Sequence, residues 1–239
     1  MYINDTHIGF FIGIFILGLL VGQFVDWMNK RLPEYKINFK PNYILMLITA
    51  ILYCAILYRY GVQKTLIENL NLIKYLILTP MLLSAFVIDY RQQIIPNRLN
   101  LTMFEIGLII AFLYGMSNVA ITVDMLLGML VGGGIFLAIT LIGSLIYGKE
   151  ALGFGDVKLM GALGLYFGVS NILAISAMSF LIGAILGIIL IVTKIKKSNE
   201  YIPFGPFIVI ATFISIFVPF DILLKTLLVI FTLGTYKAV

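Results

Sequence analysis

The sequence is poor in charge and nearly free of cysteine, and both shortages exclude classes of protein. Only 11% of its 239 residues are Asp, Glu, Lys or Arg, whereas soluble globular domains contain about 25%. The single cysteine, Cys54, cannot build a disulfide framework, a Cys-based zinc cluster or a Cys-x-x-Cys redox pair. The basic residues are scattered between apolar runs rather than gathered in a stripe with aromatic residues, so a nucleic-acid partner is not expected.

What the sequence has in excess is apolar residues. They make up 62% of the chain, and the mean hydropathy is +1.10, which predicts an integral membrane protein surrounded by lipid. Hydrocarbon offers the backbone no hydrogen-bond partners, so the apolar runs must be helices, and each crossing needs about 20 residues. We therefore predict an all-α, polytopic helical bundle with eight or nine transmembrane segments, forming a single domain over residues 1–239.

Nine apolar runs carry this prediction. Six are clear and a seventh is shorter: Ile8–Val25, Tyr43–Tyr58, Leu72–Ile88, Leu101–Met116, Met125–Tyr147, Asn171–Val192 and the shorter Pro203–Val218. Val157–Gly168 is only half a crossing long, and Ile222–Gly234 is equally suited to the membrane interface. The first run is expected to stay as an anchor rather than be cleaved as a signal sequence, because no basic residue precedes it.

The basic residues predict how the chain is oriented. The loop after the first run holds Lys30, Arg31, Lys36 and Lys40, and the positive-inside rule places such a loop in the cytoplasm, with the N-terminus outside. If Val157–Gly168 crosses the membrane, alternation brings most other basic loops to the same side. These loops hold Arg91, Arg98, Lys149, Lys158, Lys194, Lys196 and Lys197, while Arg59, Lys64 and Lys74 fall outside.

Acidic residues at membrane depth are costly, so each of them is a candidate functional residue. Asp89 ends the third apolar run, and Asp156 stands just before Val157–Gly168. Both lie at the predicted cytoplasmic edge of the membrane. Glu105 lies inside the fourth run and Asp124 begins the fifth run at the outer face, so only Asp89 and Asp156 share a level.

Two carboxyl groups at one level suggest an acid–base pair. Held close together in a low-dielectric site, they cannot both ionise readily, so they share a proton. One can then take a proton from water while its protonated partner polarises a scissile carbonyl, as in aspartic proteases, and no metal is required. Two simpler interpretations stand beside this one: Asp89 as an interfacial acid neutralised by Arg91, and Asp156 as an acid at a helix N-terminus.

The residues before Asp156 favour a peptidase. Gly153 and Gly155 flank Phe154, and glycine lets another peptide approach the backbone closely. A helical substrate must be opened before it can be cut, so backbone without side chains beside a carboxylate suits such a site. Lys158, two residues after Asp156, is placed to bias the charge of the carboxyl pair.

Three stretches resemble the type IV prepilin peptidase family, membrane aspartic proteases of the Gly-x-Gly-Asp class. The stretch G-F-G-D-V-K-L-M-G-A-L-G, Gly153–Gly164, resembles the family's second aspartate motif, and D-Y-R-Q-Q-I-I-P-N-R-L-N, Asp89–Asn100, resembles its first. The stretch I-P-F-G-P-F-I, Ile202–Ile208, is similar to a late motif of the family. Together they relate about half of the chain to this family.

The resemblance implies a catalytic pair and a substrate. Asp89 and Asp156 would be catalytic, and the enzyme would remove basic leader peptides from prepilins or pseudopilins at the cytoplasmic face of the bacterial plasma membrane. It would need no cofactor for proteolysis. The residues expected to contact substrate are Gly153, Phe154, Gly155, Lys158, Pro96, Asn97, Pro203, Gly205 and Pro206.

One departure from the family concerns a second activity. Many members also methylate the new N-terminus of the pilin from S-adenosylmethionine. Here Gly22–Pro33 resembles an altered form of a family motif, with Asp26 where Asn is usual. The loop from Trp27 to Asn42 has sixteen residues and no cysteine, so the zinc-binding insertion of bifunctional members is missing. Methylation, and with it S-adenosylmethionine, stays open, as does the oligomeric state.

Three other functions remain open. Presenilin-type intramembrane proteases share Gly-x-Gly-Asp, but they read Tyr before their first Asp, whereas here Tyr90 follows Asp89. A proton-coupled transporter could use Asp89, Asp156 and Glu105 as a relay, because intramembrane acids are its expected signature. A catalytically silent subunit of a pilus or secretion assembly is the third, and the intact motifs argue against it.

Overall fold

The computed structural model describes residues 2–3, 6–31, 42–65, 67–148, 152–194 and 202–232. Most of loop 27–42, together with Lys149, Lys196 and Lys197, lies outside the described residues. The elements of the described part are β1 (Tyr2–Ile3), β2 (Thr6–His7), α1 (Ile8–Asn29), α2 (Tyr43–Tyr60), α3 (Leu70–Gln92), α4 (Asn97–Gly115), α5 (Val119–Tyr147), α6 (Phe154–Val192), α7 (Gly205–Phe217) and α8 (Phe220–Phe231). Apart from the short antiparallel pair of β1 and β2, these elements are all helices, as the sequence predicts.

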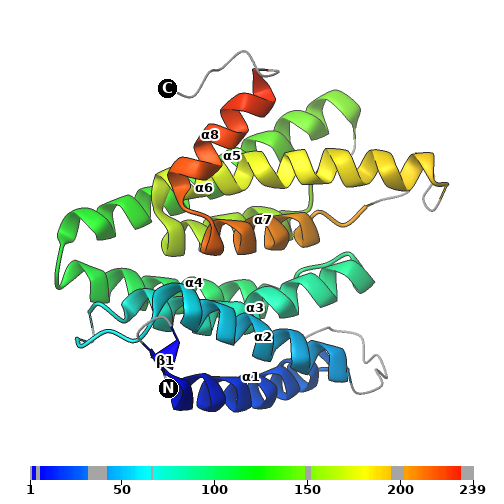
Figure 1. Ribbon diagram of the computed structural model, residues 1–239. Helices are drawn as coiled ribbons and strands as arrows, with labels where there is room; N and C mark the ends of the chain where they lie inside the picture. Colours follow the sequence, from blue (N-terminus) through cyan, green and yellow to red (C-terminus); the bar gives the residue numbers. More distant parts are fainter. Residues whose placement is uncertain are drawn as a thin grey trace.

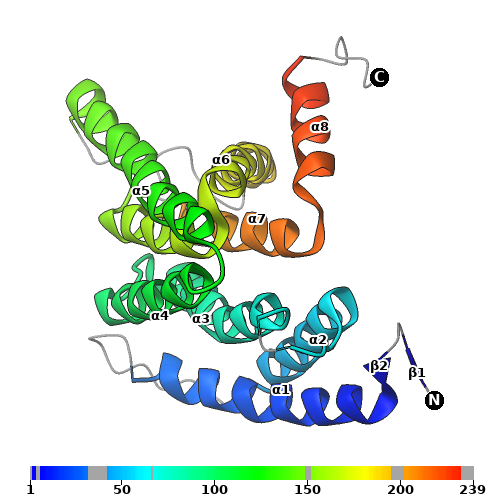
Figure 2. The ribbon, with the colours of Figure 1, turned by 90° about the vertical axis from the view of Figure 1, so that its left-hand side faces the viewer.

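The helices lie in successive layers. Figure 2 shows α1 at one edge, then a row of α2, α3 and α4, then α7 beside the beginning of α6. The rest of α6 and the oblique α5 lie on the far side, and α8 is steeply inclined to the other helices (Figure 1). The core follows this order, since α6 packs against α4, α5 and α7.

Within the described residues, six helices are long and apolar enough to cross a membrane: α1, α2, α3, α4, α5 and α6. A multi-pass membrane protein is therefore supported, but the predicted eight or nine segments are not reached. The difference has three causes. Two predicted runs merge into α6, α7 has only 13 residues, and α8 has only 12.

Helix α6 is two arms joined by a reversal at Gly168. This residue has φ 71° and ψ −179° inside an otherwise helical stretch, a conformation that suits glycine. The residues on either side of it both approach α5: a Cβ built on Gly132 would meet Met160 O at 2.7 Å and Ile172 Cγ1 at 2.8 Å. The first arm, residues 154–167, therefore runs back along α5, and the second arm, residues 169–192, runs forward again (Figure 1).

Two side chains from other helices hold this reversal. Lys74 of α3 is buried and donates a hydrogen bond from Nζ to the carbonyl oxygen of Tyr166, at 2.9 Å. Asp124 of α5 accepts a hydrogen bond at Oδ1 from the N–H of Val169, at 3.2 Å. A helix ends with unpaired carbonyls and begins with unpaired N–H groups. Lys74 supplies a donor for a carbonyl at the end of the first arm, and Asp124 supplies an acceptor for an N–H at the start of the second arm. The two residues thereby fix the first arm, which carries Asp156.

Glycines allow α5 and the first arm to touch through their backbones. A Cβ on Gly128 would lie 2.7 Å from the carbonyl oxygen of Gly164 and 2.8 Å from the Cα of Gly168. Small residues at such seams let membrane helices approach closely, and close approach is a main source of packing energy in lipid. The seam sets how near α5 comes to the arm that carries Asp156.

The seam predicts a difference between two Gly→Ala changes on α5. Gly128→Ala should lower the free energy of unfolding by about 1–3 kcal/mol, because the added methyl overlaps backbone that cannot move aside. Gly134→Ala, where a Cβ would meet nothing within 4 Å, should leave stability unchanged or raise it by up to about 1 kcal/mol through helix propensity. Unfolding in detergent micelles, followed by circular dichroism, compares them. Equal effects of the two changes on the free energy of unfolding would contradict the close backbone contact between α5 and the first arm at Gly128.

Candidate active site

Asp89 lies at the end of α3 and is held by the start of α7. Its side chain is 3% exposed, and Oδ2 accepts a hydrogen bond of 2.9 Å from the N–H of Gly205, 116 positions later in the chain. Gly205 is the first residue of α7, and the first N–H groups of a helix have no partner inside the helix. The carboxyl group of Asp89 therefore satisfies a helix terminus while it joins α3 to α7.

Asp156 lies in the first turn of α6. It is also 3% exposed, and its Oδ1 is buried without a hydrogen-bond partner. An acid in the first turn of a helix is favourable for the helix itself, so position alone does not mark Asp156 as functional. The unpartnered oxygen is the less ordinary feature, because buried polar atoms are nearly always paired, and it leaves Oδ1 available to a ligand.

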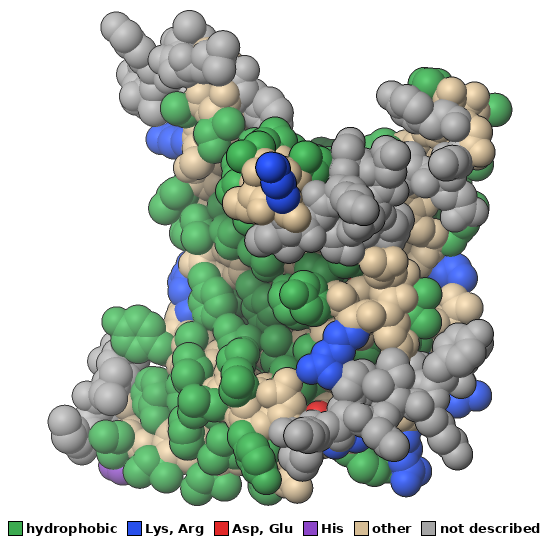
Figure 3. All heavy atoms as spheres, turned by 90° about the vertical axis from the view of Figure 1, so that its right-hand side faces the viewer, with side chains coloured by type: hydrophobic (Ala, Val, Ile, Leu, Met, Phe, Trp, Pro, Cys, Tyr) green, Lys and Arg blue, Asp and Glu red, His purple; other side chains and the backbone are tan. Residues whose placement is uncertain are grey.

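The two carboxyl groups share one cavity of about 430 Å³, and they are within electrostatic reach of each other. The cavity is lined by Asp89, Gln93, Ile94, Ile95, Asn97, Leu152, Gly153, Phe154, Gly155, Asp156 and Lys158. It lies at the end of the bundle where α3 ends and where α4 and α6 begin. Figure 3 shows this end, with Lys and Arg side chains around a small carboxylate area.

Gly155 lets two segments of the cavity wall meet. A Cβ there would lie 3.2 Å from the Cβ of Ile95, closer than most real contacts. On the other side of the peptide, the side-chain amide of Asn100 donates a hydrogen bond from Nδ2 to the carbonyl oxygen of Gly155, at 3.1 Å. The start of the first arm is thereby held against α4 and the turn that precedes it.

Sequence reasoning did not identify Asn100 as a site residue. The signal was present, because Asn97 and Asn100 are three positions apart and so share one face of a helix. An amide at membrane depth on the same face as a predicted site residue is the pattern that would have found it. The structure also adds Gln93, Ile94, Ile95 and Leu152 to the predicted lining residues.

Lys158 contacts Asn97 rather than a carboxyl group. Its Nζ donates a hydrogen bond of 2.6 Å to Asn97 Oδ1, and both side chains lie at an exposed edge of the cavity. Asn97 belongs to α4 and Lys158 to the first arm of α6. The pair therefore bridges the two elements beside the carboxyl groups.

Four predicted site residues are not among those that line the cavity: Gly205, which donates a hydrogen bond to one of the carboxyl groups, and three prolines. Pro96 stands at the N-cap of α4, and Pro203 and Pro206 are buried around the start of α7. Proline suits the beginning of a helix because it lacks the N–H that would stay unpaired there. These prolines therefore stand next to Asn97 and Gly205 at the starts of α4 and α7.

The other acids are placed elsewhere. Glu105 is exposed on α4 and is not among the residues that line the carboxyl cavity. Asp124 holds the reversal at Gly168 through Val169. The three-acid relay of a proton-coupled transporter is therefore not assembled around this cavity. Within the described residues, no group of three or more His, Cys, Asp or Glu is arranged to hold a metal ion.

Comparison with known proteins relates this site to a family. The sequence profile of the type IV leader peptidase family matches residues 76–188, a range that contains both carboxyl groups and every residue that lines their cavity. Residues 76–188 belong to the type IV leader peptidase family. The family expected from the motifs around Asp89 and Asp156 is thus confirmed, and no solved structure matches the chain.

Several curated relatives carry the name prepilin leader peptidase/N-methyltransferase. The protein of Aeromonas hydrophila is 30% identical over 191 residues, which cover 80% of this chain and 63% of the relative. That of Xanthomonas campestris pv. campestris is 32% identical over 175 residues, covering 73% and 58%. That of Pseudomonas aeruginosa is 36% identical over 141 residues, covering 59% and 48%. The matches therefore span between about half and two thirds of the relatives' length.

Proposed function

We propose that this chain is a membrane aspartic endopeptidase that removes the basic leader of type IV prepilins or pseudopilins at the cytoplasmic face. The observation that carries the proposal is the shared cavity. Asp89 and Asp156, 67 positions apart in the sequence, are both 3% exposed and line one cavity at one end of a helical bundle. The family of residues 76–188 and the names of the relatives agree with this activity.

The two carboxyl groups divide the chemistry between them. One is ionised and takes a proton from a water molecule, whose oxygen attacks the scissile carbonyl carbon. The other is protonated and gives its proton to the carbonyl oxygen, which forms a tetrahedral intermediate. As the C–N bond breaks, the carboxyl group that took the water proton gives it to the leaving amine. The other carboxyl group takes a proton back from a hydroxyl of the intermediate, so the pair is again singly protonated. Asp156 Oδ1, which is buried and has no partner, is an atom free to bind the water.

The basic residues at this end of the bundle support the proposed orientation. Arg91 and Arg98 flank the turn between α3 and α4, Lys158 follows Asp156, and Lys194 follows α6. By the positive-inside rule this end faces the cytoplasm and the N-terminus lies outside. A prepilin with its basic leader in the cytoplasm and its apolar helix in the bilayer would then present the junction at the level of the cavity. Lipid surrounds the exposed apolar helix faces.

Co-expression with a candidate prepilin tests the proposal. Mass spectrometry of the product should show a single cut between the basic leader and the apolar segment. A cut deep inside the apolar helix would support the presenilin-type alternative. Proton-driven flux in liposomes without any hydrolysis would support the transporter. An intact prepilin beside well-expressed, membrane-inserted protein would contradict the peptidase.

A second activity, methylation of the new N-terminus from S-adenosylmethionine, is supported by the names of the relatives. Near the end of α1, Asp26 is ion-paired with Lys30 at 2.8 Å, whereas Asn29 is 2% exposed and both of its amide atoms lack a partner. A buried unpartnered amide fits a residue that holds a polar ligand, so Asn29 would contact the bound donor, whose sulfonium supplies the methyl group. The same mass spectrum would show an added methyl, and Asn29→Leu should weaken equilibrium binding of S-adenosylmethionine.

A further inference from the structure

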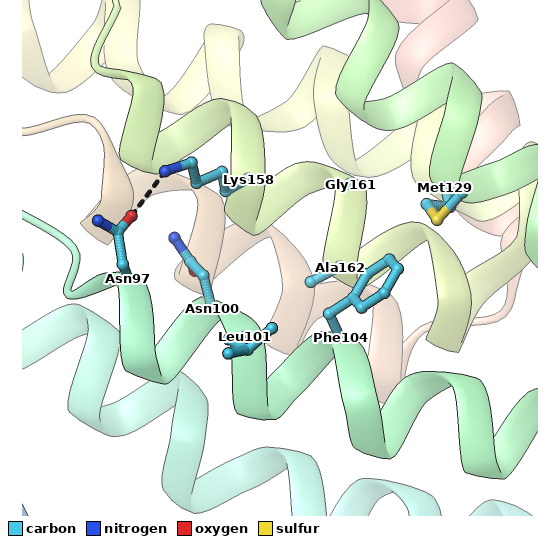
Figure 4. Close-up of a pocket in the computed structure, with 8 residues that line it drawn as sticks. All are labelled: Asn97, Asn100, Leu101, Phe104, Met129, Lys158, Gly161 and Ala162. Atoms are coloured by element: carbon cyan, nitrogen blue, oxygen red, sulfur yellow. Dashed lines mark hydrogen bonds between the residues drawn. The ribbon is translucent and has the colours of Figure 1, made fainter.

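A second cavity of about 480 Å³ adjoins the carboxyl cavity (Figure 4). Asn97 and Lys158 line both cavities, and the hydrogen bond between them crosses the boundary. The second cavity extends from this bond along α4, between α4, α5 and the first arm of α6. From Asn97 to Phe104 the helix advances about 10 Å away from the bundle end and into the membrane.

The chemistry of the second cavity changes along its length. Its beginning is polar, with Asn97, Asn100 and Lys158, and its continuation is apolar, with Leu101 and Phe104 of α4 and Met129 of α5. Leu101 is 56% exposed, so the cavity is accessible from the side of α4. A ligand that fits must carry hydrogen-bonding groups at one end and apolar side chains at the other.

Asn100 offers this ligand a hydrogen-bond acceptor whose position is fixed by the surrounding structure. The residue is 4% exposed, and its Nδ2 is already used by the carbonyl oxygen of Gly155. Its Oδ1 is buried and has no partner. An unpaired N–H would satisfy it, and Lys158 Nζ beside it can donate to a carbonyl. Every peptide unit of an extended chain presents both an N–H and a C=O, so the polar end fits a peptide backbone.

We propose that the second cavity binds the first residues of the substrate's apolar segment, directly after the scissile bond. This inference rests on the proposed peptidase function. The main-chain N–H of one of these residues donates to Asn100 Oδ1, and their side chains contact Leu101, Phe104 and Met129. The Asn97–Lys158 hydrogen bond opens when a peptide occupies both cavities, because it crosses the path between them. The basic leader stays on the other side of the carboxyl groups, at the bundle end.

Another apolar groove provides a matched control. It lies between α2, α3 and α7, has a volume of about 330 Å³, and includes Ile48, Leu83 and Phe213. It shares no lining residue with the carboxyl cavity, whereas the second cavity shares Asn97 and Lys158 with it. Ile48, 41% exposed, is a counterpart there to Leu101.

Disulfide trapping tests the inference. The probe is a synthetic prepilin with a Lys-rich leader, about 20 apolar residues and one cysteine in the first turn after the leader. The chain carries Cys54→Ala, which removes its only cysteine, and Asp89→Asn, so that the peptide stays whole. Leu101→Cys is compared with Ile48→Cys, and Met129→Cys serves as a second position if Leu101→Cys does not fold. We expect at least tenfold more cross-linked product at Leu101 or Met129 than at Ile48.

Cross-linking at Ile48, equal cross-linking at both grooves, or none at any position would overturn the inference. The proposed function is read separately, from cleavage of the same synthetic prepilin by the protein with Cys54→Ala alone. Cleavage together with trapping at Ile48 leaves the peptidase in place and removes the second cavity from its substrate path. If the prepilin is not cleaved but is trapped at Leu101, the second cavity binds the peptide and the proposed peptidase activity is contradicted.

Discussion

Asp89→Asn and Asp156→Asn are each expected to abolish leader cleavage, lowering kcat/KM at least about 1000-fold. Each variant keeps one carboxyl group, and a single group cannot be the ionised base and the protonated acid in the same step. Both substitutions keep the shape of the side chain, and an Asn at position 89 can still accept the hydrogen bond from Gly205. Expression, membrane insertion and helix content should therefore persist. The measurement is the rate at which each purified variant cleaves a candidate prepilin in detergent or liposomes.

The double variant sharpens this prediction. Since the two carboxyl groups act as a unit, removing both should lose little more activity than removing one. Full additivity of the two losses would mean that the residues act in separate steps. Glu105→Gln is the matched control, since Glu105 is an exposed acid outside the carboxyl cavity. The activity of Glu105→Gln should match that of the unchanged protein. A loss as large as that of Asp89→Asn or Asp156→Asn would support the proton relay instead.

Gly205→Ala is expected to lower kcat about 100-fold with little change in KM, because a displacement of about 1 Å at a catalytic group has effects of this size. A Cβ at position 205 would lie 2.6 Å from Asp89 Oδ2 and 3.0 Å from its Cγ. The methyl group must push the carboxyl group away from the N–H that holds it. Steady-state kinetics on a synthetic prepilin separate kcat from KM.

Gly187→Ala is the control for this change. A Cβ at position 187, in the second arm of α6, would meet only Ile202 Cδ1 at 3.9 Å, which is ordinary contact. Its kcat should stay within about twofold of the unchanged protein, since small changes away from packed sites are nearly neutral. A Gly205→Ala variant as active as Gly187→Ala would show that the Gly205 N–H does not position Asp89 for the reaction.

The helices were largely predictable from the sequence, and α1 and α2 begin at the predicted residues, but α4 and α5 begin earlier than predicted. The predicted run Leu101–Met116 begins in the structure at Asn97, and Met125–Tyr147 begins at Val119. The first turn of α4 is mostly polar, and in α5 Thr122 and Asp124 separate the first residues of the helix from the longer apolar run. Pro96 marks the true start of α4 through its geometry, since proline fixes the backbone that leads into a helix.

The half-length run Val157–Gly168 is explained by its contacts. Sequence reasoning required it to cross the membrane so that the basic loops would share a side. In the structure it is the first arm of α6, which ends at the φ of 71° at Gly168 and reverses against α5. Lys74 is an exception to the positive-inside rule in the predicted orientation. In the structure it donates a hydrogen bond to the carbonyl oxygen of Tyr166, next to this reversal.

The sequence by itself determined that the chain is a helical membrane protein with two acids at one level. Apolar length decides this, because lipid leaves the backbone no partner outside a helix. Only the tertiary structure decided three contacts of the site. Asp89 accepts a hydrogen bond from the N–H of Gly205, and Lys158 donates one to Asn97. Asn100 donates one to the carbonyl oxygen of Gly155, while its Oδ1 stays without a partner. These contacts join residues 55 to 116 positions apart. They depend on how helices pack and where α6 reverses, which local pattern does not encode.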